Sequence, residues 1–512
     1  MHKFNLPKIS KLGYLVLILG FFLGLSSIAF FKGGYYLLSS PYQFANGEGY
    51  FLYLATQVAH GHQIYLPMTS TSYLDVPYTP VFFLITGLLV RVFGSTLLIV
   101  KIVPFIAGIG SSILIGFIVH FITKNRIVGI LGSLILLSSQ VLKFLSPMAR
   151  VDTLALFFCL LGVYIFLRYE DSKKFLWCIP LLVLTWFTKQ SYIAAPLAIG
   201  IYLFCKGRLK DTIIFSVLYG ILLGGLLLIG NWITNGELVQ NTLVYFGSQI
   251  GGQQIWVWSS GIYGIVYYHW TLLLLVSIYA FTWGKRLNFL IVYFLVAMIL
   301  CLVTIGKPGA SWHYCLESVS IASIIAGICL DKVFKVLDSK PKLGKTLLAA
   351  VPLGLLVLLS IGTPFGAGFC NYTIESNSSN EYTGIINTIK DSTTPVFSEE
   401  SIFPLYANVS WEPWEPANVL TADLENKSWN DSILISRLKG SYYEYILSSI
   451  DLSQAYSTYS TSWQAYIVKQ RFSLDMAKAV LLNHILVYHS GPLNSIPDGI
   501  YIYKYYGSNF SK

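Results

Sequence analysis

Over residues 1–363 the chain alternates long apolar runs with short polar connections. A helix that crosses a membrane needs about 20 consecutive apolar residues, and most of these runs approach or exceed that length. The sequence therefore predicts a mostly α-helical, polytopic membrane bundle with about eleven spans. The runs that we expect to cross are 13–31, 96–121, 127–146, 151–168, 174–188, 191–205, 212–233, 262–283, 287–305, 314–330 and 346–363.

Lysine and arginine gather in the connections between these runs. About half of the 34 basic residues lie in the N-terminal tail and in the connections 123–126, 168–174, 206–210, 284–286 and 331–345. Cytoplasmic loops of membrane proteins carry such an excess, so we place all six segments in the cytoplasm. The N-terminus is then cytoplasmic and the chain after residue 363 is extracytoplasmic. We expect a multi-pass protein of the plasma (inner) membrane.

One apolar segment does not cross the membrane in this topology. Between the first span and Lys124 the chain must cross once, yet two apolar segments, 81–93 and 96–121, lie there. The first contains Arg91 and has only about 13 residues, which is short for a span at about 1.5 Å per residue. We predict that 81–93 lies along, or dips into, the outer face, as a juxtamembrane helix of an outer loop 33–95.

The remaining residues, 364–512, differ in composition. Asn, Ser, Thr, Tyr and Trp become frequent, and no further run is long enough to span. Short β-branched and aromatic runs predict strands at 395–398, 445–447, 485–488 and 500–503. Helical patterns occur at 432–438 and 474–482. We therefore predict a transmembrane module, 1–363, followed by a small extracytoplasmic α/β domain, 364–512.

Composition supports the membrane assignment and excludes several classes of function. Only 11% of the residues are charged, against about 25% in soluble domains. The formal net charge of +10 comes largely from the connections, so no nucleic-acid partner is indicated. The seven cysteines show no CxxC or His-Cys spacing, and we expect neither a disulfide framework nor a zinc knuckle. No nucleotide-binding loop, dinucleotide fingerprint, serine-hydrolase elbow or metalloprotease motif occurs.

Polar residues that could take part in chemistry lie on the predicted outer side. Ionisable groups near membrane depth are costly and tend to mark pathways or sites. Residues from several outer connections would meet in one cavity if the bundle folds around it. These residues are Glu48, Asp75, Asp152, Glu237 and Glu317, with Arg150, Lys189, Gln190 and His313.

Glu48 is the most distinctive of these acids. It stands between Gly47 and Gly49, just before an aromatic amphipathic helix. Flanking glycines suit a general base that needs open backbone access to a substrate hydroxyl. An acid that stabilises a helix N-terminus through the helix dipole has the same pattern, and the sequence leaves both interpretations open.

Asp152 and Lys189 also have two interpretations each. Asp152 follows Arg150 by two residues at the head of a span. The two residues form a structural ion pair, or Asp152 is a second acid beside an arginine that contacts a phosphate. Lys189 and Gln190 occupy a tight outer turn. The lysine either extends to the membrane interface or neutralises an anionic leaving group.

His313 and Glu317 are four residues apart at the head of a span, so we predict that they share one helix face. The histidine is either an interfacial hydrogen-bonding residue or a substrate ligand. Asp75 and Glu237 lie in loops, where solvation is the alternative to substrate contact, and we favour solvation for Glu237.

Several of these segments resemble motifs of one enzyme family. Residues 46–65, with Glu48, are similar to the first outer loop of GT-C-fold glycosyltransferases related to the protein O-mannosyltransferases and the aminoarabinose lipid A transferases. YTPVFFLITGLLVRVFG resembles the second juxtamembrane helix of that family, and ARVDTLAL resembles its second acidic motif. TKQSYIAAP and GASWHYCLE look like two further outer motifs. Members often have Asp at the first-loop position, and some have Lys or His near the second helix, where this chain has Glu48 and Tyr78.

The resemblance implies an inverting glycosyltransferase that takes a hexosyl or pentosyl group from a polyprenyl-phosphate-linked donor. Glu48 would deprotonate an acceptor hydroxyl on a glycan, lipid or protein, and the hydroxyl would displace polyprenyl phosphate in one step. Asp152 would be the second catalytic acid, and a divalent metal ion held by Glu48 and Asp152 is an open alternative. The expected substrate contacts are Arg150, Lys189, Gln190, His313, Glu317, Asp75 and Tyr78.

Two other functions fit the same sequence. A lipid or glycan transporter or flippase would carry out no transferase chemistry, but we find no pair of broken spans related as inverted repeats. A non-catalytic assembly protein would use its C-terminal domain for binding and would tolerate the loss of every outer acid.

Overall fold

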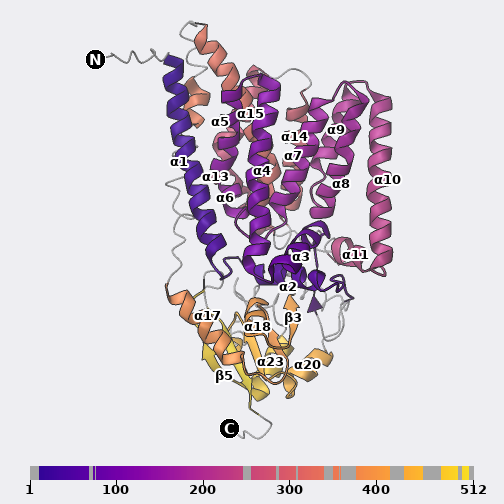
Figure 1. The fold of residues 1–512 in the computed structure, drawn as a ribbon, viewed down its shortest axis with the longest axis vertical. Helices are drawn as coiled ribbons and strands as arrows, with labels where there is room; N and C mark the ends of the chain where they lie inside the picture. Colours follow the sequence, from indigo (N-terminus) through magenta and orange to yellow (C-terminus); the bar gives the residue numbers. More distant parts are fainter. Residues whose placement is uncertain are drawn as a thin grey trace, which may run out of the picture.

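The structure, a computed structural model, has two parts: a bundle of long helices, and a sheet with its own helices at one end of that bundle (Figure 1). Helix α1 runs from the far end of the bundle towards the sheet. The residues that the structure describes are 11–45, 47–67, 73–74, 76–245, 255–283, 288–306, 310–339, 350–356, 358, 376–415, 432–453, 474–493 and 499–506.

Each predicted span up to residue 330 contains at least one helix. Among the described residues, four helices (α1, α4, α10 and α13) are long and apolar enough to cross a membrane by length and composition. The predicted run 346–363 lies largely outside the described residues. In chain order the bundle helices are α1 (Lys11–Ser39), α4 (Leu97–Thr123), α5 (Arg126–Ser138), α6 (Gln140–Leu145), α7 (Asp152–Arg168), α8 (Cys178–Thr188), α9 (Ala194–Cys205), α10 (Leu209–Ile233), α13 (Ile255–Thr282), α14 (Phe289–Thr304) and α15 (Leu316–Asp338).

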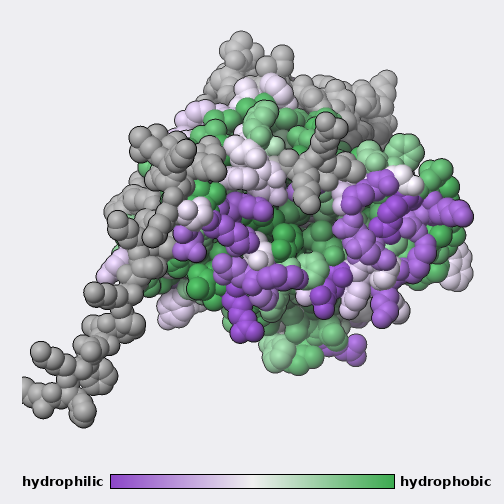
Figure 2. Space-filling view, turned by 90° about the horizontal axis from the view of Figure 1, so that it is seen from above, coloured by the Kyte–Doolittle hydropathy of each residue, from purple (hydrophilic) through white to green (hydrophobic). Residues whose placement is uncertain are grey.

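The bundle end that lies away from the sheet carries groups of polar side chains. Figure 2 looks onto this end and shows polar side chains gathered between apolar ones. The connections 168–174 and 206–210 lie there, where Lys173 pairs with Asp211. These two described basic connections therefore lie away from the sheet.

Three short helices lie at the opposite end, next to the sheet: α2 (Glu48–Ala59), α3 (Val81–Phe93) and α11 (Glu237–Val239) (Figure 1). Helix α3 does not run the length of the bundle, in agreement with the crossing count. It packs on α2 through Phe83, whose ring centroid is 5.8 Å from that of Phe51. Its opposite face exposes a stripe of apolar side chains, Leu84, Leu88 and Val92, which suits a helix that lies in a membrane interface.

The sheet has six strands in the order β1-β3-β2-β4-β6-β5. The first four are parallel, whereas β6 pairs antiparallel with both β4 and β5. The strands are β1 (Tyr73–Leu74), β2 (Val396–Ser398), β3 (Trp411–Glu415), β4 (Tyr445–Ser448), β5 (His484–His489) and β6 (Tyr501–Tyr505). Its helices are α17 (Ser376–Ile389), α18 (Ile402–Ala407), α20 (Ser432–Lys439) and α23 (Leu474–Asn483).

The four predicted strands and the two predicted helices of this region are confirmed, but β1 and β3 were not predicted. Strand β3 reads Trp-Glu-Pro-Trp-Glu, and proline is depleted in strands because it cannot donate to a ladder. Strand β1 comes from the outer loop, and its Tyr73 is in register with Trp414. The sheet therefore includes a strand from the part of the chain that we assigned to the transmembrane module.

The bundle end and the sheet share a hydrophobic core. Phe51 and Leu54 of α2, Phe83 of α3, and Ile402 and Phe403 of α18 are all buried in one cluster. Burying such a side chain contributes about 1.5–3 kcal/mol each, so the sheet is packed firmly against α2.

Candidate functional site

A buried ion pair lies at the sheet end of the bundle. Asp152 is the first residue of α7, and Lys189 follows the last residue of α8 in extended conformation. Lys189 Nζ lies 2.5 Å from Asp152 Oδ1, and both side chains are almost fully buried. The lysine also lies over the Tyr314 ring, 4.7 Å from its centroid. The pair therefore joins two helices that are separate in the sequence, and its ammonium group faces an aromatic wall.

Arg150 and His313 are two further ionisable neighbours of Asp152. Both interact electrostatically with this carboxylate. Burial of the imidazole lowers the pKa of His313 to about 3, which outweighs the opposing effect of Asp152. His313 is therefore neutral at pH 7. The candidate cations for binding a leaving phosphate are then Lys189 and Arg150.

A cavity of about 100 Å³ opens beside the ion pair. Residues from the start of α7, the α8–α9 turn, α14 and the start of α15 line this cavity. Its polar lining is Asp152, Lys189, Ser191, Tyr192, Tyr314 and Glu317, with Thr304. Three of the predicted site residues, Asp152, Lys189 and Glu317, are therefore brought together as the sequence suggested.

Glu317 lies at the inner wall of this cavity. Its Oε1 accepts a hydrogen bond from the Tyr293 hydroxyl at 2.7 Å and a weaker one from the Cys159 thiol at 3.7 Å. His313 and Glu317, which we predicted to share one helix face, do not lie in a single α-helix. Residues Trp312–Cys315 form a 3₁₀ helix and α15 begins only at Leu316.

Glu48 is enclosed rather than open. Its Oε2 accepts from the backbone N–H of Phe44 at 2.7 Å and lies 3.5 Å from Lys101 Nζ, and its Oε1 accepts from the N–H of Ala149 at 3.0 Å. The side chain is 1% exposed and does not line the Asp152 cavity. Its contact with Ala149 nevertheless places it beside the segment that leads into Asp152.

The two flanking glycines serve the fold. Gly47 has φ +85°, a conformation that other residues adopt only with strain. A Cβ atom on Gly49 would lie 2.6 Å from the backbone nitrogen of Ile402. The interpretation of Gly49 as open access for a substrate is therefore wrong, because α18 occupies the space beside it.

Lys101 was missed at the sequence level. It lies inside α4, is fully buried, and donates to the Tyr42 carbonyl at 2.9 Å as well as pairing with Glu48. A lysine within an otherwise apolar span is itself a signal of a buried partner, and that signal could have identified it.

Gln190 and Tyr78 join the outer loops. Gln190 Nε2 donates to the carbonyls of Pro77 and Thr242, at 2.6 and 3.0 Å. The carbonyl of Tyr78 accepts from the Tyr65 hydroxyl, and Tyr78 lies close enough to Tyr314 to affect it electrostatically. Asp75 lies outside the described residues.

Solved structures with the same arrangement of elements decide the fold. ArnT from Cupriavidus metallidurans bound to undecaprenyl phosphate superimposes with a TM-score of 0.61 at 12% identity, over 96% of this chain and 98% of that one. The archaeal oligosaccharyltransferase AglB from Archaeoglobus fulgidus, in complex with an inhibitory peptide and a dolichol-phosphate, superimposes with a TM-score of 0.52 at 12% identity, over 96% and 74%. The chain has the GT-C fold of membrane glycosyltransferases.

The sequence adds one match to this GT-C assignment. Residues 75–233 match a family model described as dolichyl-phosphate-mannose-protein mannosyltransferase. Asp152, Lys189 and Gln190 lie inside this range, whereas Glu48 and Glu317 lie outside it. A comparison with curated proteins finds no match.

A divalent ion between Glu48 and Asp152 does not fit this GT-C site. The Lys189 ammonium forms an ion pair with Asp152 Oδ1. The Glu48 carboxylate accepts hydrogen bonds from backbone N–H groups and pairs with Lys101. A cation placed there would face two ammonium groups. Among the residues that the structure describes, no cluster of three or more His, Cys, Asp or Glu side chains forms a metal site.

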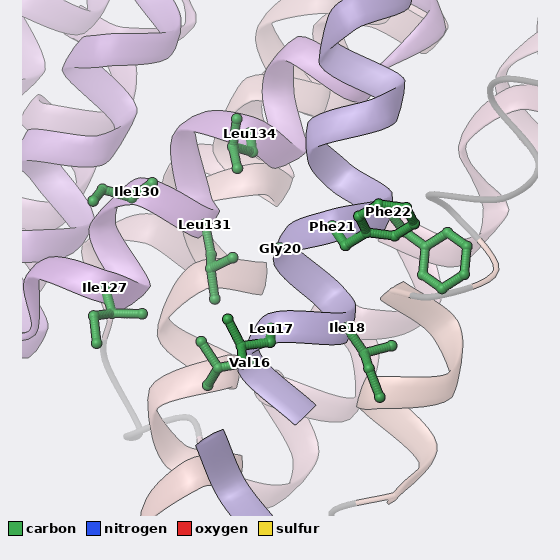
Figure 3. A pocket seen from close by; sticks show the side chains of 10 residues that line it. All are labelled: Val16, Leu17, Ile18, Gly20, Phe21, Phe22, Ile127, Ile130, Leu131 and Leu134. Carbon is green, nitrogen blue, oxygen red and sulfur yellow. The ribbon is translucent and has the colours of Figure 1, made fainter. Parts of the chain in front are cut away.

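A second hollow, of about 660 Å³, lies between α1 and α5 (Figure 3). Its lining is entirely apolar and includes Phe21, Phe22, Ile130 and Leu134. It offers no group for acid–base or charge chemistry, in contrast to the Asp152 cavity.

Proposed function

We propose that this protein is an inverting glycosyltransferase that moves a hexosyl or pentosyl group from a polyprenyl-phosphate-linked donor to an acceptor hydroxyl at the outer face of the membrane. The observation that carries the proposal is the buried Asp152–Lys189 pair at the rim of a polar cavity, within a GT-C bundle. The polyprenyl phosphates named with ArnT and AglB support the same class of donor.

In this proposal the leaving phosphate meets cations that are already in place. Lys189 and Arg150 stabilise the charge that develops as the bond between the anomeric carbon and the phosphate oxygen breaks. Because Asp152 and the Tyr314 ring hold the Lys189 side chain in place, the ammonium group is preorganised for the phosphate. Asp152 is therefore the acid that positions the phosphate-binding cation.

Glu48 is the proposed base. The acceptor oxygen forms the new bond to the anomeric carbon while its proton passes to the Glu48 carboxylate, and inversion follows from the single displacement. A general base must come within about 2.6–3.2 Å of the proton's oxygen, yet Phe44 and Ala45 cover Glu48. The acceptor therefore reaches Glu48 only when this segment moves.

The proposed topology has eleven spans in the plasma membrane, with a cytoplasmic N-terminus. The basic connections then face the cytoplasm, and α2, α3 and the sheet face the outside. The apolar stripe on α3 supports the placement of this helix in the membrane interface.

The test is sugar transfer by the purified protein from a polyprenyl-phosphate-linked donor, with membrane lipids and envelope glycans as acceptors and no ion gradient. Mass spectrometry should detect both released polyprenyl phosphate and a glycosylated product. Asp152→Asn should lower kcat by about 100-fold or more, because the phosphate-binding lysine loses its anchor. Donor that crosses the bilayer without being cleaved would instead indicate a flippase, and the proposal would be wrong.

A further inference from the structure

A buried hydrogen bond joins the loop before Glu48 to the C-terminal part of the chain. Gln43 Nε2 donates to Glu400 Oε2 at 2.6 Å, although the two residues are 357 positions apart. Gln43 Oε1 accepts from the backbone N–H of Gly49 at 3.3 Å. Both side chains are buried. The amide of Gln43 thus connects the sheet with the residue that follows Glu48.

Glu400 occupies a special position in the sheet. It comes just after β2, the strand that has β3 on one side and β4 on the other, all three parallel. Chain connections through α18 and α20 lead to opposite sides of β2, so the strand order reverses there. In open α/β sheets ligands bind outside the carboxyl ends of the strands at such a point. In this protein the loop that precedes Glu48 lies at that point, because Glu400 contacts Gln43 and α18 packs on Gly49.

The same loop is held at two further points. The Tyr42 hydroxyl donates to Ser379 Oγ at 2.8 Å, and the Tyr42 ring lies 4.4 Å from that of Tyr382. The Tyr406 hydroxyl donates to the Pro41 carbonyl at 2.9 Å. Contacts from α17 and α18 therefore fix the residues immediately before those whose N–H groups bind Glu48.

We propose that Gln43 and Glu400 are positioning residues for Glu48, and that the C-terminal sheet serves to hold the catalytic loop in place. The inference rests on the proposed function, because it assumes that the position of Glu48 matters for sugar transfer. The sheet holds Gln43, Gln43 holds Gly49, and the loop between them supplies the N–H groups that orient the Glu48 carboxylate.

An exchange of the two partners tests the inference. Gln43→Glu places a second carboxylate against Glu400 in a buried setting, where like charges repel strongly. We expect kcat to fall at least about tenfold, with the donor KM within about twofold of wild type, since displacement of a catalytic group by about 1 Å has effects of this size or larger. Glu400→Gln alone keeps an acceptor oxygen for Gln43 and should leave kcat near wild type.

The double variant Gln43→Glu/Glu400→Gln restores a donor and an acceptor in the reverse direction. It should recover kcat to within about threefold of wild type. A Gln43→Glu variant with unchanged kcat, or a double variant as impaired as the single one, would show that the inference is wrong. If Gln43→Glu does not fold, Gln43→Ala removes both hydrogen bonds without adding charge and provides the same comparison with wild type.

Two controls separate this inference from its alternatives. Glu412→Gln weakens a network with Arg437 and Tyr443 in the same sheet but away from the loop, and it should not change kcat. An equal loss there would attribute the effect to domain stability and overturn the inference. Glu48→Gln tests the proposed function itself. If it abolishes transfer while Gln43→Glu does not, the proposed function stands and the inference falls. If it leaves transfer intact, the role of Glu48 is wrong and the positioning role falls with it.

Discussion

Asp152 and Glu48, both buried carboxylates, differ in the kind of partner that neutralises them. Asp152 meets one ammonium at 2.5 Å and borders a cavity, whereas Glu48 is enclosed by backbone N–H groups with an ammonium at 3.5 Å. A buried ion pair that loses one partner leaves an uncompensated charge, which costs about 3–5 kcal/mol. Lys189 and Lys101 are therefore structural requirements as well as parts of the site.

At the residue scale, His313 should make stability depend on pH. Burial lowers its pKa to about 3 in the folded protein, against about 6.5 when unfolded. Below pH 6.5 the unfolded state therefore binds a proton that the folded state does not, so stability falls as the pH falls from 6.5 towards 3. His313→Gln should remove this contribution, so that the apparent Tm in detergent declines less between pH 7 and pH 5.

The charges that face His313 are Asp152, Lys189 and Arg150, and all three remain in the His313→Gln variant. A matched control is His60→Gln at an exposed position, which should not alter the pH dependence. If wild type and His313→Gln lose Tm equally on acidification, the histidine is not neutral in the folded protein.

At the scale of elements, the N-terminus of α2 is the point where three parts of the molecule meet. The helix begins at Glu48 after a left-handed Gly47, its first turn contacts the start of α18 at Gly49, and its acid binds Ala149 before α7. Each contact depends on the other two, because the helix cannot shift towards one partner without leaving another.

Gly49→Ala should consequently impair both assembly and activity. The added methyl group would meet the Ile402 backbone at 2.6 Å, and backbone atoms cannot give way as a flexible side chain can. We expect a loss of about 1–3 kcal/mol in stability, typical of overpacking, seen as a lower Tm and easier proteolysis between residues 59 and 81.

Gly24→Ala is the matched comparison for this prediction. Gly24 lies in α1 with nothing within 4 Å of the position of an added Cβ, and alanine has the higher helix propensity. It should leave Tm unchanged or raise it slightly. Equal behaviour of the two variants would contradict the close approach of α18 to α2.

At the scale of the whole molecule, the polar and apolar surfaces are arranged along one axis. The described basic connections 168–174 and 206–210 lie at one end of the bundle, lipid-compatible side chains such as Ile221 and Leu228 of α10 are exposed along its length, and the sheet lies at the other end. This arrangement suits a membrane protein whose Asp152 cavity lies at the sheet end of the bundle.

The proposed sidedness predicts opposite labelling of the two ends. In a background with Cys205→Ser, which removes an exposed thiol, and Cys370→Ser, which removes the cysteine of the C-terminal part of the sequence, Thr383→Cys should react with a membrane-impermeant maleimide in intact cells. Ser172→Cys should react only after the membrane is permeabilised. Both positions are exposed in the structure, so the reverse pattern would show that the topology is inverted.

Much of this molecule was predictable because the relevant information is local in the sequence. Apolar run lengths and basic connections predict the bundle, its ends and the non-spanning α3, and short β-branched runs predict β2, β4, β5 and β6. Asp152 and Lys189 were also identifiable, since ionisable residues at span ends are rare.

What the sequence by itself determined is therefore the helices of the bundle, the strands β2, β4, β5 and β6, and the residues worth considering for chemistry. Only the tertiary structure decided how they meet: the pairing of β1 with β3, the enclosure of Glu48 by Lys101, and the contact of Gln43 with Glu400. The physical reason is that these contacts join segments tens to hundreds of residues apart, and a pattern of neighbouring residues carries no information about which distant surface will pack against it.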